Sequence, residues 1–307
     1  MRGISPARPE GPLLNRSIFA TLTPLCQPCL GLPMSNPAPA DIAAADLEAV
    51  PTANPGLAVP DTAMIFAAGR GQRMRELTDK APKPMLEVAG RPLIDWVIDR
   101  TIASGVKRIV VNTSYLGEQI RDHLKDRKDA EFHLITEEER LETGGGVYNA
   151  RAILGEQPFF AINADTLWLD GPTPLLHRLA AIWDDNRMDA CLMVQPTVRV
   201  FGDYDGAGDF EMEPDGALIR RQPWNIAPFV YGGVQLVSPR LLTEPPAKAF
   251  SFNHYWDQAI EAGRLFGMSH DGVWFHVGTP EGLDLADQHL RPERARWLDP
   301  LDNLDMV

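Results

Sequence analysis

Short apolar runs rich in β-branched residues alternate with longer amphipathic stretches from about residue 61 onward. Apolar runs without polar alternation predict strands that are buried on both faces of a sheet. The predicted strands are 63–68, 108–112, 132–136, 159–163 and 190–194, and the predicted helices between them are 93–104, 116–126, 146–154 and 174–186. This alternation predicts an α/β fold, Rossmann-like, with a mixed and mostly parallel sheet and helices on both faces.

The regular alternation of strand and helix patterns ends at about residue 208. Pro214, Asp215 and Gly216 lie between two strand-like runs within 209–221, which predicts a small β-hairpin insertion. Further strands near 229–237 and 273–277 and a helix over 280–290 complete the predicted domain.

The first 60 residues differ from the rest because they hold 11 of the 27 prolines, which prevent any helix or strand from running far. We therefore predict a disordered Pro/Ala-rich extension over 1–60, one folded domain over 61–292 and a C-terminal tail over 293–307. Cys26 and Cys29 form a C-x-x-C pair in the extension, but no second pair or nearby histidine supports a metal or redox site.

The composition argues against several classes of protein. With 29 basic and 42 acidic residues the net charge is −13, whereas a general nucleic-acid binder would carry a basic stripe. Three cysteines are too few for a disulfide framework and predict a reducing, cytoplasmic compartment. No uncharged run approaches the roughly 18–20 apolar residues of a membrane helix. We expect neither nucleic acid nor a membrane as a partner.

A glycine-rich turn follows the first predicted strand. Gly69 and Gly71 allow close approach of a ligand to backbone N–H groups, and the Arg73 guanidinium suits phosphate oxygens. Dinucleotide binding would need a third small residue where Met74 stands, and the P-loop pattern is absent. The alternative is a structural turn with incidental arginines.

Lys83 lies between two prolines a short distance further on, so its charge is carried on a stiff segment. Residues 69–91 contain six basic and three acidic side chains, a local balance of +3 in an acidic chain. This segment is predicted to be an anion site.

Three segments in this region resemble the opening of the sugar-1-phosphate nucleotidyltransferases: 67–74 (A-A-G-R-G-Q-R-M), 82–85 (P-K-P-M) and 90–94 (G-R-P-L-I). The resemblance implies the nucleotide-diphospho-sugar transferase fold and a loop that wraps a nucleoside triphosphate. It assigns nucleotide binding to Ala68, Gly69, Gly71, Arg73 and Lys83. It assigns catalytic roles to Arg73, Lys83 and Asp165.

Residues 141–146 (L-E-T-G-G-G) match another segment of the family and precede a predicted helix. Consecutive glycines form either a flexible loop or a bare backbone on which a base and a sugar can lie at a helix N-terminus. The resemblance implies that Gly144 contacts the nucleotide and that Glu142 and Thr143 contact the sugar.

Asp165 follows the buried strand predicted at 159–163. Active sites of open α/β sheets lie beyond the carboxyl ends of strands, although an aspartate there is often only a helix cap. In the family the corresponding aspartate binds magnesium, after a glycine that Ala164 replaces here. Mg²⁺ takes oxygen ligands and needs only one or two carboxylates plus substrate phosphates.

His276 marks a departure from the family pattern. Residues 274–280 (W-F-H-V-G-T-P) resemble W-x-D-V-G-T-P, with His276 in place of the second acidic ligand. Imidazole is a poor ligand for Mg²⁺. His276 therefore either binds the metal, contacts phosphate or fills the pocket wall, or another carboxylate takes the aspartate's part.

Residues 231–235 (Y-G-G-V-Q) match the region that carries a sugar-contacting small residue in relatives, which assigns Gly233 to the sugar site. The alternative is a core strand with a bulge. Trp224 and Asn225 lie just before this strand and are candidates for closing the sugar pocket.

The resemblance spans about 63–290 and implies an enzyme that forms an NDP-sugar and pyrophosphate from a nucleoside triphosphate and a sugar 1-phosphate, with Mg²⁺. No hexapeptide repeats follow, which argues against the acetyltransferase-coupled uridylyltransferases. The arrangement is most similar to N-acetylmuramate-1-phosphate uridylyltransferases of cell-wall recycling, which use UTP. Mannose-1-phosphate guanylyltransferases, which use GTP, are the alternative. We expect a monomer or a small homo-oligomer.

Two other classes stay open. A catalytically silent nucleotide-sugar binding protein would fit the change at His276. A metal-dependent glycosyltransferase would use a D-x-D motif, and residues 203–205 (D-Y-D) form one, but in a Gly/Asp-rich loop instead of at a strand end.

Overall fold

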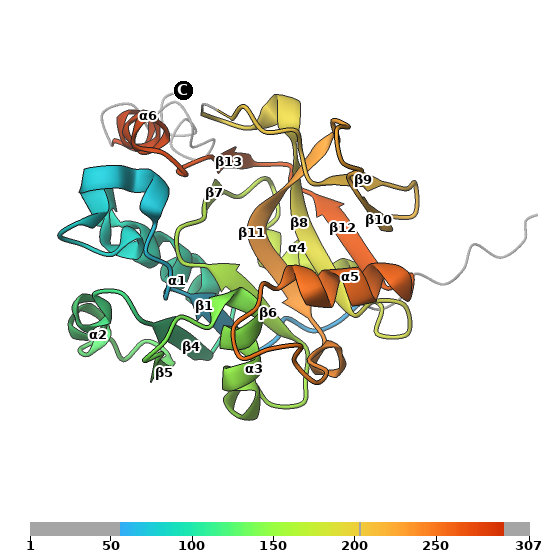
Figure 1. Ribbon diagram of the computed structural model, residues 1–307, viewed down its shortest axis with the longest axis horizontal. Coiled ribbons are helices and arrows are strands. Elements are labelled where there is room, and N and C mark those ends of the chain that lie inside the picture. Colours follow the sequence, from blue (N-terminus) through green and yellow to red (C-terminus); the bar gives the residue numbers. More distant parts are fainter. Residues whose placement is uncertain (1–55, 203, 292–307) are drawn as a thin grey trace, which may run out of the picture. The chain divides into compact units, whose positions relative to one another are not determined.

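The structure is a computed structural model that describes residues 56–202 and 204–291. Within these residues the apolar runs form one large sheet of nine strands with helices packed on both faces (Figure 1). Its strands are β1 (Thr62–Phe66), β4 (Arg108–Thr113), β5 (Glu131–Thr136), β6 (Phe159–Asn163), β8 (Ala190–Pro196), β9 (Phe210–Met212), β10 (Leu218–Arg220), β11 (Phe229–Val237) and β12 (Leu265–Ser269). Two short pairs lie outside it: β2 (Glu87–Val88) with β3 (Arg91–Pro92), and β7 (Leu167–Leu169) with β13 (Val273–Phe275).

The described α-helices are α1 (Leu93–Ala103), α2 (Gly117–Leu124), α3 (Glu142–Leu154), α4 (Leu175–Ile182), α5 (Asn253–Glu261) and α6 (Pro280–Leu290). Four short 3₁₀ helices accompany them: η1 (Gln72–Thr78), η2 (Lys83–Met85), η3 (Thr197–Arg199) and η4 (Pro239–Leu241).

The sheet is mixed, as the sequence predicted. Strands β6, β1, β4 and β5 run parallel to one another, and β11 joins β6 in the antiparallel sense. On its other side β11 pairs with β8, and β12 extends β8 in parallel. The long strand β11 therefore connects the parallel strands to a second group of strands that carries the hairpin β9–β10.

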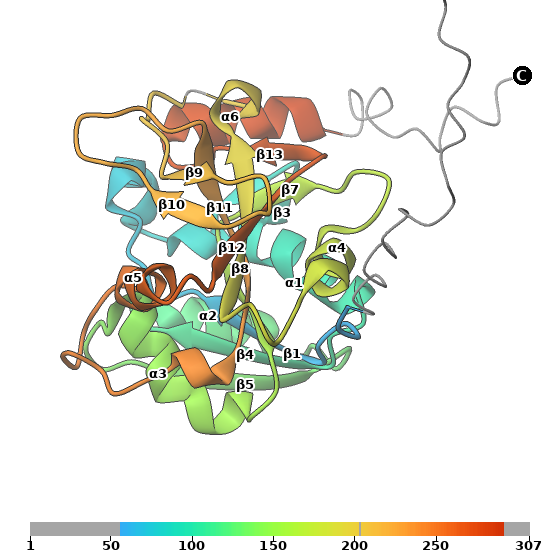
Figure 2. The ribbon, with the colours of Figure 1, turned by 90° about the vertical axis from the view of Figure 1, so that its right-hand side faces the viewer.

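Side-chain alternation along the strands divides the core between the two faces of the sheet. Ala63 and Ile65 of β1 pack with apolar residues of α1, α2 and α4, whereas Met64 packs with residues of α3 and α5. Figure 2 shows α1 and α4 on the opposite side of the sheet from α5. Burial on both faces explains why these strands are continuously apolar in sequence.

The hairpin was predicted correctly. Strands β9 and β10 are antiparallel, and the turn between them contains Gly216 at φ +91°. The helix α5 and the strand β12 were missed. Polar residues interrupt the apolar positions of α5, and β12 is a short run that contains Gly267.

Contact with the domain begins slightly before the predicted boundary at residue 61, since the Leu57 backbone N–H donates to the carbonyl of Ala180 at 2.8 Å. The rest of the predicted N-terminal extension, with Cys26 and Cys29, and the predicted tail from residue 293 lie outside the described residues. The domain boundaries therefore stay a prediction. None of the helices formed by residues 56–202 and 204–291 has the length and apolar character needed to cross a bilayer.

We predict that Phe160→Ala, in the fully buried centre of β6, lowers the free energy of unfolding by about 3–5 kcal/mol. The loss combines the transfer free energy of the ring with the cavity it leaves. Urea denaturation measures it, and Ile182→Ala on the exposed side of α4 serves as the control, with an expected change under about 1 kcal/mol. Equal losses for the two variants would contradict the assignment of β6 to the core.

Candidate functional site

The site begins where two neighbouring parallel strands end. Phe66 of β1 lies opposite Asn163 of β6 in the parallel register, so the segments that follow both strands emerge at one edge of the sheet. The first segment carries the glycine turn with Gly69 and Gly71, and the second carries Asp165. This edge is where open α/β sheets bind ligands.

Gly71 determines how the glycine turn packs. Its φ of +68° lies in the left-handed region, and its carbonyl accepts from the Met74 N–H at 2.8 Å where η1 begins. A Cβ at this position would lie 2.8 Å from the Cβ of Lys83. The absence of a side chain therefore allows the turn to pack directly against Lys83. At Gly69 a Cβ would meet no atom within 4 Å, so that backbone faces open space.

Lys83 is buried. Charged side chains are rarely buried unless they have a partner. It begins the short helix η2, where its carbonyl accepts from the Leu86 N–H at 3.0 Å. Its Nζ donates to Oδ2 of Asp165 at 2.6 Å, although 82 residues separate the two in sequence. The Pro-Lys-Pro segment thus places a positive charge in a fixed position beside the end of β6.

Asp165 is ionised at neutral pH in this arrangement. Burial by itself raises the pKa of its carboxyl group, but the charge and hydrogen bond of Lys83, its own backbone hydrogen bond and the charge of Arg73 together lower the pKa below its usual range. The side chain is still 34% exposed, so one edge of the carboxylate stays accessible.

Two cavities meet at the Lys83–Asp165 pair. One of about 480 Å³ is bounded by the glycine turn, with Arg70, Gly71 and Arg73, and by Arg140 and Thr143 on the opposite wall. The other has a volume of about 330 Å³. Five residues line both cavities: Arg73, Lys83, Asn163, Asp165 and Gly278. The pair therefore lies at the junction of two binding spaces.

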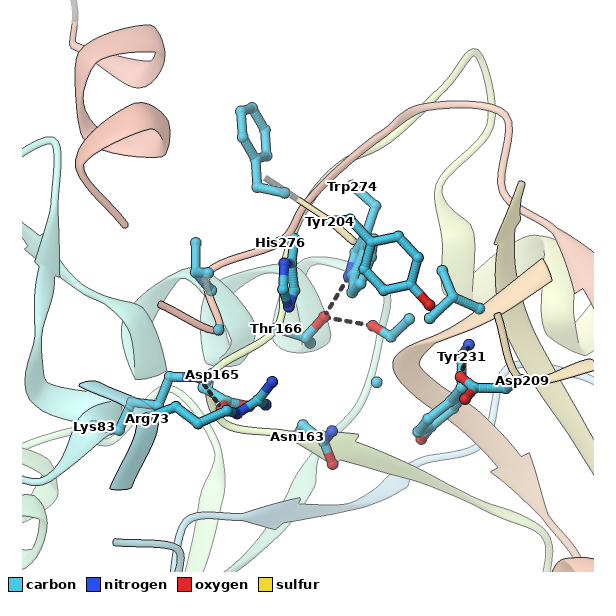
Figure 3. A pocket seen from close by; sticks show the side chains of 16 residues that line it. Arg73, Lys83, Asn163, Asp165, Thr166, Tyr204, Asp209, Tyr231, Trp274 and His276 are labelled. Atoms are coloured by element: carbon cyan, nitrogen blue, oxygen red, sulfur yellow. Dashed lines mark hydrogen bonds and ion pairs between the residues drawn. The ribbon is translucent and has the colours of Figure 1, made fainter. Parts of the chain in front are cut away.

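The smaller of these cavities has aromatic walls (Figure 3). Tyr204, Tyr231, Trp274 and His276 line it, together with the carboxylate of Asp209. The hydroxyl group of Tyr231 is buried without a hydrogen-bond partner among the described residues. Flat rings with a few polar groups suit a sugar ring and its hydroxyls.

Thr166 connects the walls of this cavity. Its Oγ1 donates to the Gly232 carbonyl at 2.6 Å and accepts from Nε1 of Trp274 at 3.2 Å. Gly233, at φ +85°, lies in a bulge of β11, and a Cβ there would be 2.9 Å from the Cβ of Thr166. Gly233 thus lies in a strand bulge and also lines the cavity. Its contact with a sugar stays a prediction.

His276 lines the same cavity as Asp165, with its ring edge-on to Tyr204 at a centroid separation of 5.5 Å. A Cβ on Gly278 would lie 2.5 Å from Nε2 of His276 and 3.3 Å from Nη1 of Arg73. The imidazole thus lies on the side of the site where Arg73 points. Among the described residues no group of three or more His, Cys, Asp or Glu side chains forms a metal cage.

The glycines at 144–146 correct one expectation. They do not precede the helix but form part of α3, which begins at Glu142. Added Cβ atoms would lie 2.5 Å from the Phe250 ring at Gly144 and 2.5 Å from the Lys248 carbonyl at Gly145. Gly144 and Gly145 therefore pack against the 248–251 segment of this chain, and tertiary packing outweighs the poor helix propensity of glycine. Gly144 does not line the cavities described, and its role in nucleotide binding stays a prediction.

Thr143 faces the large cavity, and Glu142 lines a smaller one of about 60 Å³ beside it, together with Ala68 and Gly69. Oγ1 of Thr143 also accepts from the Phe252 N–H at 2.9 Å. Both residues lie on the glycine-turn side of Asp165, whereas the aromatic cavity lies on its other side. The predicted contact of Glu142 and Thr143 with the sugar stays a prediction.

Sequence reasoning did not identify the two tyrosines as walls of the second cavity. Tyr231 directly precedes the Gly-Gly pair, and Tyr204 is the central residue of 203–205 (D-Y-D), but neither position had a period or spacing that marked it as a wall. Arg140, next to the L-E-T-G-G-G segment, was also missed. Trp224, a candidate for closing the pocket, is 99% exposed and lines none of the cavities described. Asp203 of that D-x-D lies outside the described residues.

Comparisons with known proteins agree with this geometry. Residues 62–199 match the family model described as nucleotidyl transferase. An N-acetylmuramate alpha-1-phosphate uridylyltransferase from Caulobacter vibrioides is 39% identical over 75% of this chain and 97% of its own length. One from Neisseria meningitidis is 33% identical over 71% of this chain and 93% of its own length.

The fold is similar to that of a solved structure, HddC from Yersinia pseudotuberculosis, with a TM-score of 0.60. The match covers 76% of this chain and all of that one, at 23% identity. The nucleotide-diphospho-sugar transferase fold expected from the sequence is thereby confirmed.

We predict that Gly71→Ala weakens the binding of inorganic pyrophosphate about tenfold or more, because the new Cβ pushes the turn away from Lys83. Calorimetric titration measures the affinity. Gly90→Ala is the matched control: its φ of +72° imposes the same backbone strain, but its Cβ meets no atom within 4 Å. If both variants lost affinity equally, backbone strain and not the contact with Lys83 would explain the effect.

Proposed function

Because this chain belongs to the sugar-1-phosphate nucleotidyltransferase family, we propose that it transfers a uridylyl group from UTP to N-acetylmuramate 1-phosphate. The products are a UDP-sugar and pyrophosphate, which suits a role in peptidoglycan recycling. The observation that carries the proposal is the Lys83–Asp165 pair at the junction of two cavities. The names of two relatives, at 39% and 33% identity, support this choice of sugar and base.

The two cavities suit the two substrates. The large cavity beside the glycine turn carries Arg70, Arg73 and Lys83, three cations for a triphosphate. The aromatic cavity accepts the sugar, with the Asp209 carboxylate and the unpartnered Tyr231 hydroxyl available to its polar groups. The α-phosphorus of the nucleotide and the phosphate of the sugar then meet beside Asp165.

In the proposed reaction an oxygen of the sugar phosphate attacks the α-phosphorus in line, a new P–O bond forms, and the bond to pyrophosphate breaks with its electron pair. The attacking oxygen is already anionic, so no general base is needed. Arg73 and Lys83 orient the triphosphate and neutralise the charge that develops on the departing pyrophosphate. Because Lys83 is buried and held by Asp165, its charge needs little reorganisation during the reaction.

The donor set fits a magnesium ion with few protein ligands. Asp165 offers an ionised, partly accessible carboxylate that would hold Mg²⁺, an ion that needs only one or two protein carboxylates. When bound, such an ion supplies charge neutralisation at the phosphate oxygens. We assign Asp165 as its protein ligand. His276 is the less suitable ligand, and its position near Arg73 leaves it to contact a substrate phosphate.

The compartment and the assembly follow from the same proposal. A reaction that consumes UTP, in a chain with few cysteines, belongs in the cytoplasm. Its partners are the two small substrates, with neither nucleic acid nor membrane involved. The described residues form both cavities within one chain, which is compatible with a monomer or a small homo-oligomer.

We predict that Lys83→Ala and Asp165→Asn each lower the turnover number by about 100-fold or more, since the first removes a cation beside the reacting phosphates and the second removes the charge of the assigned magnesium ligand. Pyrophosphate release measures turnover, and thermal melting verifies that each variant is folded. Lys80→Ala, which removes an exposed lysine three residues earlier, is the control and should keep wild-type turnover within about twofold. Near-normal turnover of either site variant would refute the assigned chemistry.

The substrate assignment is tested by a pyrophosphate-release screen with Mg²⁺. UTP, GTP, CTP and dTTP are each paired with N-acetylmuramate 1-phosphate, mannose 1-phosphate and glucose 1-phosphate. We expect UTP with N-acetylmuramate 1-phosphate to have the highest kcat/KM. The highest value for GTP with mannose 1-phosphate would establish the alternative guanylyltransferase. Tight nucleotide-sugar binding without pyrophosphate from any pair would indicate a silent binding protein.

A further inference from the structure

A buried polar pair connects the two walls of the nucleotide cavity. Asn112 at the end of β4 is 2% exposed, and Glu137 just after β5 is 4% exposed. Nδ2 of Asn112 donates to Oε1 of Glu137 at 2.7 Å. Neither residue belongs to the segments that resemble the family, and neither lines the Lys83–Asp165 junction.

The remaining side-chain oxygens of this pair, Oδ1 of Asn112 and Oε2 of Glu137, accept hydrogen bonds from backbone N–H groups of the two walls. Oδ1 of Asn112 accepts from the Ala67 N–H at 3.0 Å, directly before the glycine turn. Oε2 of Glu137 accepts from the Leu141 N–H at 3.0 Å, directly before Glu142 and Thr143. A continuous chain of three hydrogen bonds therefore runs from the glycine turn to the start of α3.

The pair lies beneath a ligand space. Asn112 lines the cavity of about 60 Å³, whose other walls include Gly69 and Thr143. Gly69, Thr143, Phe66 and Arg140 also line the 480 Å³ cavity, so the small space is a side extension of the large one. A change in the length of the hydrogen-bonded chain would alter the separation of both walls.

Burying the Glu137 carboxylate is costly because no described cationic side chain pairs with it. Two donors and the nearby N-terminus of α3 compensate for part of this cost. Helix α3 comes so close that a Cβ on Gly146 would lie 2.8 Å from Nδ2 of Asn112 and 3.0 Å from Oε1 of Glu137. An apolar pair would fill this space without a buried charge, but it would leave both backbone N–H groups without acceptors.

We infer that Asn112 and Glu137 are a positioning pair that sets the spacing between the glycine turn and the start of α3, and so determines affinity for the nucleoside triphosphate. The inference rests on the proposed function in taking the large cavity as the nucleotide site. The pair acts through backbone N–H groups and not on the reacting phosphates. Its loss should therefore weaken nucleotide binding far more than it slows turnover at saturation.

The chemistry of the pair allows a rescue experiment. Asn112→Asp places two carboxylates face to face, and Glu137→Gln leaves one of its two donors without an acceptor. When both substitutions are combined, the carboxylate at position 112 accepts from Ala67 and from the amide at position 137, whose oxygen accepts from Leu141. The double exchange restores all three hydrogen bonds with carboxylate and amide interchanged.

The experiment measures Kd for UTP and for GTP by calorimetry, with KM and kcat for the reaction and the melting temperature of each variant. We expect Asn112→Asp to raise the nucleotide Kd about tenfold or more and Glu137→Gln about three- to tenfold. The combined variant should return to within about threefold of wild type, with kcat and KM for the sugar phosphate nearly unchanged throughout. Gln235→Leu is the control, because it removes another buried hydrogen bond, to Trp256, away from the cavities described.

Variants that melt earlier but bind nucleotide as tightly as wild type would overturn the inference, as would a combined variant that binds no better than the worse single one. Either result leaves the proposed function intact. A wild-type protein that prefers GTP or releases no pyrophosphate would instead contradict the proposed function. The inference would still be tested by the Kd values of the variants for whichever nucleotide the wild type binds more tightly.

Discussion

The ion pair between Lys83 and Asp165 is the contact on which the rest of the site depends. It joins the segment after β1 to the end of β6, and it lies where both cavities meet. A buried ammonium is costly without a partner, and the neighbouring Lys83 keeps the Asp165 carboxylate ionised. Each charge therefore stabilises the other, and together they provide a preorganised polar point between two substrates that both carry phosphate.

Glycine serves this arrangement through close packing more than through flexibility. Gly71 brings its turn against Lys83, Gly233 brings β11 against Thr166, and Gly146 brings α3 against Asn112 and Glu137. In each case a methyl group would meet the neighbouring side chain at about 3 Å or less. The walls of the site are thus positioned by contacts that only a bare backbone allows.

Much of the fold was readable from local pattern. Apolar runs located β1, β4, β6 and β8, because strands covered on both faces have to be apolar throughout. The partly exposed strand β5, at the end of the strand order, was also located, from its Phe, Leu and Ile residues. Other elements were harder: α5 was missed because polar residues interrupt its apolar positions, and β12 because its short apolar run contains Gly267. At the site, the structure brings Gly71, Arg73, Lys83 and Asp165 together around one cavity, because loops after adjacent parallel strands meet at one edge. Their roles in binding and catalysis stay predictions.

The sequence by itself determined the type of sheet, the concentration of positive charge in 69–91 and a carboxylate at the end of a central strand. These are properties of short segments, since burial and charge act over a few residues at a time. Only the tertiary structure decided that Lys83 pairs with Asp165 across 82 residues, that Tyr204, Tyr231 and Trp274 share one cavity, and that the glycines of α3 face protein. Those contacts depend on strand order and register, which bring distant segments together and leave no period in the sequence.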